Sequence, residues 1–143
     1  MTGTDVESFQ PAGRWSLPKV LHGTGVLLSV GALAVSEIPN PSIGFPIAVA
    51  VVAALGYHSS PSTSRPAILR TIRGGVTKGG MRQGAFIKSM FAVALFIAGS
   101  YPTLLGTGGV DLPSLLLGMA LLLSSVGTEL EARRIDRFLQ ASA

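Results

Sequence analysis

The chain of 143 residues contains no cysteine. This absence excludes disulfide bonds, thiolate-bound metals, iron–sulfur clusters and a cysteine nucleophile. Charged residues are also scarce, at 13% of the chain, compared with roughly a quarter in soluble domains. Because 48% of the residues are hydrophobic, the chain cannot easily cover its surface with polar groups in water. We therefore expect a small integral membrane protein.

The motifs of common enzyme classes are missing as well. The sequence has no HExxH or GxSxG motif, no DxD-type carboxylate cluster and no Ser/His/Asp set that membrane helices would assemble. The glycine-rich run at 74–80 lacks the spacing of a phosphate-binding loop, and no strand is expected before it. We predict a protein that is not an enzyme and that binds no cofactor.

Four apolar stretches cover residues 17–35, 41–57, 84–99 and 112–127. At 1.5 Å per residue each is roughly 24–29 Å long, slightly short of a hydrocarbon core of about 30 Å. Proline-containing turns separate the first stretch from the second and the third from the fourth. The predicted fold is an all-α integral membrane protein, with four short transmembrane helices as two tandem antiparallel hairpins and a C-terminal helical extension. Two spans with two interfacial helices are the alternative, and a cleaved signal peptide is the alternative for the first stretch.

This interpretation divides the chain into five segments. They are a polar N-terminal arm (1–16), a first transmembrane hairpin (17–57), a basic loop with a short amphipathic helix (58–83), a second transmembrane hairpin (84–127) and a charged C-terminal helix (128–143).

The charges are distributed unequally between the two sides of this arrangement. All eleven basic residues fall on the side that holds both termini and the central loop, whereas the two hairpin turns carry only Glu37 and Asp111. Lys and Arg in short flanking loops keep those loops in the cytoplasm. We predict that both termini are cytoplasmic, or lie on the interior side of a virion membrane.

The basic side has two interpretations. In the first, the charges serve only to fix the topology of the chain in the membrane. In the second, they bind anionic lipid headgroups, or nucleic acid if the protein is associated with a virion. The candidate contacts are Arg65, Arg70, Arg73, Lys78, Arg82, Arg133, Arg134 and Arg137.

Small residues recur at four-residue spacing within the apolar stretches, a pattern that allows membrane helices to approach closely. The predicted packing residues are Gly44, Ala48, Ala94, Ala98, Gly118 and Ser124. They could pack the two hairpins of one chain together, or join the chain to further copies of itself or to other membrane subunits.

Four titratable residues lie at the cytoplasmic ends of the predicted spans. His22 and His58 could approach each other and ligate a haem, a chlorophyll or a metal, or could serve only as structural hydrogen-bonding residues. Lys88 could form an ion pair with Glu129 and extend toward the aqueous surface.

We predict a non-enzymatic structural or accessory subunit of a larger membrane assembly, in contact with the bilayer and its anionic lipids. The alternatives are a membrane-permeabilising, holin-like or channel protein, and a virion membrane or coat protein with its basic face toward the genome.

Overall fold

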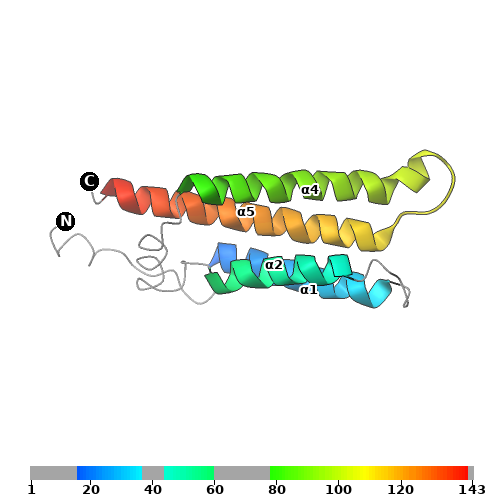
Figure 1. Cartoon of the computed structure of the whole chain (residues 1–143), viewed down its shortest axis with the longest axis horizontal. Helices are drawn as coiled ribbons and strands as arrows, with labels where there is room; N and C mark the ends of the chain where they lie inside the picture. Colours follow the sequence, from blue (N-terminus) through cyan, green and yellow to red (C-terminus); the bar gives the residue numbers. More distant parts are fainter. Residues whose placement is uncertain (1–15, 37–43, 60–77, 142–143) are drawn as a thin grey trace.

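The computed structural model describes residues 16–36, 44–59 and 78–141, and these form four α-helices without a strand among them. The helices are α1 (Leu17–Val35), α2 (Gly44–Ser59), α4 (Lys78–Leu104) and α5 (Leu112–Ala141) (Figure 1). The prediction of a helical chain is confirmed for this part of the protein.

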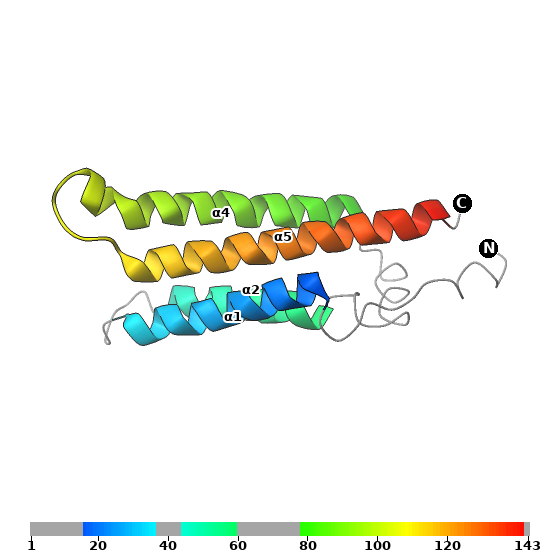
Figure 2. The same ribbon diagram turned by 180° about the vertical axis from the view of Figure 1, so that it is seen from behind.

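Helix α5 lies at the centre of the arrangement. Helix α4 packs against one side of it and α1 against the other, while α2 packs mainly on α1 (Figures 1 and 2). The start of α1, the end of α2, the start of α4 and the end of α5 lie at the same end of the molecule. We call this the basic end, because Arg82, Arg133, Arg134 and Arg137 lie on the parts of α4 and α5 nearest to it. The turn of residues 105–111 lies at the opposite, turn end.

Three helices are long and apolar enough to cross a membrane: Leu17–Val35, Gly79–Leu104 and Leu112–Arg137. The apolar part of α2 is shorter, at Pro46–Leu55. These lengths support a helical membrane protein. Helix α4 extends beyond the predicted 84–99 at both ends. The apolar stretch does not include these turns, because the first turns are polar and the last turn contains Pro102.

The helices pack through small residues. Ala32, Ala92 and Ala120 are completely buried, and a Cβ atom added to Gly118 would lie 3.2 Å from the backbone oxygen of Ala92. Close backbone approach of this kind suits a membrane, where burial of apolar side chains does not itself drive helix association.

Candidate functional site

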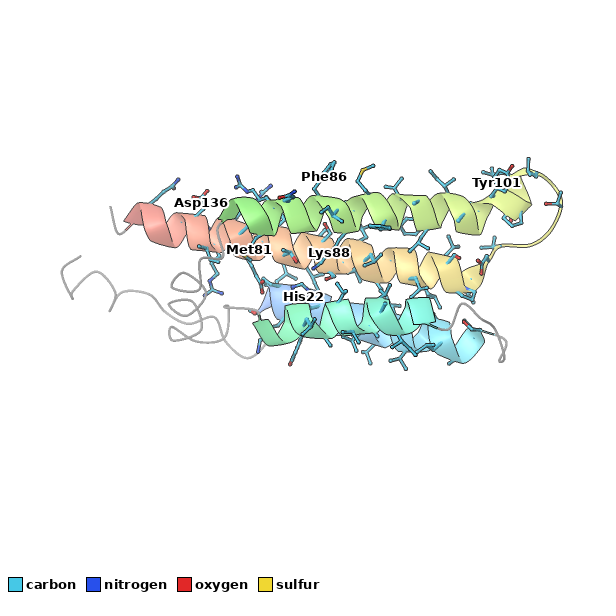
Figure 3. The ribbon with its side chains drawn as sticks, in the orientation of Figure 1. His22, Met81, Phe86, Lys88, Tyr101 and Asp136 are labelled. Atoms are coloured by element: carbon cyan, nitrogen blue, oxygen red, sulfur yellow. The ribbon has the colours of Figure 1, made fainter. Side chains whose placement is uncertain are left out.

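A group of polar side chains lies where α1, α4 and α5 meet. It consists of His22 from α1, Lys88 from α4, and Ser124, Thr128 and Glu131 from α5, and we call it the polar cluster. The three α5 residues share one face of the helix because they are spaced four and three residues apart. Helices α1 and α4 both pack against α5, and His22 and Lys88 lie in the same part of the bundle (Figure 3).

Ser124 is the centre of the hydrogen bonds in this cluster. Its hydroxyl oxygen lies 3.1 Å from Nδ1 of His22 and accepts a hydrogen bond of 3.1 Å from the Lys88 ammonium. The same ammonium donates to Thr128 Oγ1 at 3.0 Å, and the Thr128 hydroxyl donates to the Ser124 carbonyl at 2.9 Å. One serine side chain therefore connects the central helix to both of its neighbours.

The second nitrogen of His22 is in a different situation. The His22 side chain is completely buried, and its Nε2 has no hydrogen-bond partner among the described residues. The carboxylate of Glu131 lies close to it, with Oε2 4.0 Å from Nε2, and Glu131 is itself buried, with an exposed fraction of 4%. A polar atom without a partner is costly in a lipid-surrounded interior, so Nε2 is the chemically notable atom of the cluster.

Gly127 makes room for this ring. A Cβ atom at position 127 would lie 3.0 Å from Nε2 and 3.2 Å from Cε1 of His22. The same atom would lie 3.2 Å from the backbone oxygen of Pro18. A glycine in the middle of α5 thus allows α1 to approach with an imidazole between the two helices.

A second set of hydroxyls lies beside the cluster, between α4 and α5. Ser89 and Ser125 are hydrogen-bonded at 2.7 Å, and the Ser125 hydroxyl also lies within donating distance, 2.6 Å, of the Ala85 carbonyl. These contacts fix how α4 and α5 are rotated against each other, and so help to hold Lys88 toward Ser124.

The predicted ion pair between Lys88 and Glu129 is wrong. Lys88 bonds to Ser124 and Thr128, whereas Glu129 pairs with Arg133 at 2.9 Å and with Arg82 at 3.8 Å. The reason is helical geometry: Glu129 follows Thr128 by one residue and therefore lies about 100° further around α5.

Of the predicted histidine pair, the structure describes the side chain of His22 but not that of His58. His58 lies in α2, but its side chain is outside the described residues. His22 has one ring nitrogen next to Ser124 and the other beside Gly127 and Glu131. Within the described part of the chain, no group of three His, Asp or Glu residues is placed to hold a metal ion.

Of the predicted basic contact residues, some lie outside the described residues and the others lie at the basic end. Arg65, Arg70 and Arg73 lie outside the described residues, as does the side chain of Lys78 at the start of α4. At the basic end, Arg82 forms ion pairs with Glu129 and with Asp136 at 3.7 Å. A shallow hollow on α5 is lined by Leu130, Arg133, Asp136, Arg137 and Gln140, and Arg134 lies partly buried on the same helix.

The six predicted packing residues fall into two groups. Gly118 and Ser124 are buried inside the chain, where they face α4 and the polar cluster. Gly44, Ala48, Ala94 and Ala98 are exposed on the outer faces of α2 and α4. The surfaces of these four residues are therefore accessible in the single chain.

Comparison with protein-family models, with curated proteins and with solved structures finds no match to this chain. The residues and their geometry are therefore the basis for a functional proposal.

Proposed function

We propose that the chain is a non-enzymatic, four-span membrane protein that serves as a structural or accessory subunit of a larger membrane assembly. In this proposal α1 with α2, and α4 with α5, are the two transmembrane hairpins. The observation that carries the proposal is the outer face of α4, which remains open in the single chain.

The exposure of α4 differs sharply from that of α5. Only 17% of the apolar window of α4 is buried within the chain, against 50% for α5. Phe86 and Tyr101 point away from α5 on the outer side of α4 (Figure 3). A helix that contacts mainly one neighbour has most of its surface available for lipid or for another subunit.

Small residues mark where a second helix would fit on that surface. Ala94 and Ala98 are one helical turn apart and share a side of α4 with Phe91 and Tyr101, all of them exposed. On α2, Gly44 and Ala48 have the same spacing and are also exposed. Small residues flanked by large apolar ones allow close helix packing with interlocking side chains. This arrangement favours contact with a further copy of the chain or with another membrane subunit.

The test uses the natural absence of cysteine. With Ala98→Cys we expect mild oxidation of native membranes to give a disulfide-linked dimer, or a linked product with another subunit that carries a cysteine. Val93→Cys is the matched control, because Val93 is exposed on α4 but lies roughly 140° away from Ala98 around the helix. We expect at least fivefold less product from it. Equal yields from both variants, together with a monomeric mass in lipid nanodiscs, would contradict the proposal.

We propose further that the basic end is cytoplasmic. The turn of residues 105–111 contains no Lys or Arg, while the opposite ends of α4 and α5 carry four arginines. Arg133 and Arg137 are exposed there, and headgroups of anionic lipids are the partners that this surface would attract. Contact with nucleic acid belongs only to the case of a virion membrane.

The orientation can be checked by labelling single cysteines with a membrane-impermeant maleimide. Thr107→Cys, in the exposed turn, is expected to react in intact spheroplasts of an expressing bacterium. Gln140→Cys, at the exposed end of α5, is expected to react only after the membrane is opened. The reverse pattern would place the basic end outside, against the distribution of positive charge.

A further inference from the structure

The hydrogen atoms of the polar cluster can be assigned from its contacts. The Lys88 ammonium can only donate, so Ser124 Oγ and Thr128 Oγ1 are acceptors toward it. The Thr128 hydroxyl donates to the Ser124 carbonyl. The Ser124 hydroxyl hydrogen is then available for Nδ1 of His22, 3.1 Å away. This pattern corresponds to a neutral imidazole whose hydrogen is on Nε2 and faces Glu131.

The space around Nε2 limits what could bind to it. Gly127 already lies so close that a methyl group on it would be 3.0 Å from Nε2. On the other side the Glu131 carboxylate oxygen is 4.0 Å away, too far for a hydrogen bond and too near for a bulky ligand between the two atoms. Nε2 therefore has room for its own hydrogen and for no larger ligand. The ring can gain a second hydrogen only at Nδ1, which faces Ser124.

We propose that His22 and Glu131 form a proton-binding site within the helix bundle, and that the bound proton joins α1 to α5. The proton comes from water and forms an N–H bond at Nδ1 of His22. The Ser124 hydroxyl then turns from donor to acceptor, and both ring nitrogens carry hydrogen. Nε2–H closes onto the Glu131 carboxylate as a charge-assisted hydrogen bond.

The charges around His22 act in opposite directions on this site. The Glu131 carboxylate on α5 attracts an imidazolium, whereas the Lys88 ammonium on α4 repels it. From α2, Tyr57 contributes its ring, which lies beside Gly23 and under the Lys19 ammonium at 4.9 Å. Arg134 lies one turn beyond Glu131 on α5 and interacts with it. Glu131 is therefore the neighbouring charge that favours a second proton on His22, against the burial of the ring and the repulsion by Lys88.

The test measures the protonation of His22 in the full-length protein. The chain has only two histidines, so a His58→Gln background leaves a single imidazole for nitrogen NMR with isotope-labelled histidine in lipid nanodiscs. We expect one ring that changes from the Nε2–H form to the doubly protonated form between pH 8 and pH 4. At the pH where half of the rings carry the second proton, Glu131→Gln is expected to reduce the doubly protonated fraction at least fivefold.

Two further variants make the result specific. Lys88→Met removes the repelling charge and is expected to increase the doubly protonated fraction at the same pH. Glu131→Asp keeps the charge but withdraws it by one methylene, and we expect it to decrease the doubly protonated fraction by less than Glu131→Gln does. This variant also tests the proposal if Glu131→Gln does not fold. A ring that stays neutral down to pH 4, or a fraction that does not change in either Glu131 variant, would overturn the proposal.

Discussion

Replacing Gly25 by leucine is expected to destabilise the contact of α1 with α5 and to lower the free energy of unfolding by about 3 kcal/mol, the upper part of the range for overpacked cores. A Cβ atom at position 25 would lie 3.0 Å from the backbone oxygen of Ala120 and 3.6 Å from Cβ of Ala53. The first of these atoms belongs to the backbone of the central helix and cannot rotate away. The measurement is the loss of helical circular dichroism as SDS is titrated into the protein in mild detergent.

Gly31→Leu is the matched control on the same helix. A Cβ atom at position 31 would meet no atom within 4 Å. Because leucine favours the helix by almost 1 kcal/mol relative to glycine, this variant is expected to be as stable as the wild type or slightly more stable. Equal losses at both positions would mean that the close approach of α1 to α5 at Gly25 is not important for stability.

The bounds of a helix could be predicted from the sequence where the apolar stretch and the helix end at the same residues. The apolar stretch 17–35 corresponds to α1, because Pro18 follows a polar arm and Ser36 begins a proline-containing turn. The third stretch underestimates α4, which begins at Lys78 and ends at Leu104. Hydropathy marks where apolar residues end, whereas a helix continues for as long as its backbone hydrogen bonds are maintained.

The polar cluster could be predicted only in part. Ser124, Thr128 and Glu131 are spaced so that they share one face of a helix, and this pattern is visible in the sequence. The sequence does not show which neighbouring helix these residues face, because that depends on how α1 and α4 are rotated against α5.

Two features of the site were missed for different reasons. Lys88 was expected to extend toward water, because a lysine near the end of an apolar stretch usually can. A helix that begins at Lys78 instead places position 88 about 15 Å inside the helix, next to hydroxyl partners. Gly127 was missed because a glycine gives no indication of which side chain will use the space that it leaves.

The position of Lys88 inside the helix bundle predicts a second large effect of a substitution on stability. We expect Lys88→Glu to lower the free energy of unfolding by at least about 3 kcal/mol, as when a buried ion pair loses one partner. The Lys88 ammonium attracts the buried Glu131 carboxylate. A glutamate at position 88 would place a second carboxylate near the first, in a region with little water to separate the charges. Unfolding in SDS is again the measurement, with the amount of protein in the membrane fraction as a second readout.

Lys88→Met separates the effect of charge reversal from the loss of the side chain. Methionine fills similar space without a charge, and the Ser124 and Thr128 hydroxyls can keep donating to His22 Nδ1 and to the Ser124 carbonyl. We expect a loss of about 1 kcal/mol, in the range of single polar contacts between membrane helices. If Lys88 instead extended to the surface, Lys88→Glu would lower the free energy of unfolding by no more than Lys88→Met does. A difference of about 2 kcal/mol between the two variants therefore distinguishes a lysine held inside the bundle from one that only marks the membrane boundary.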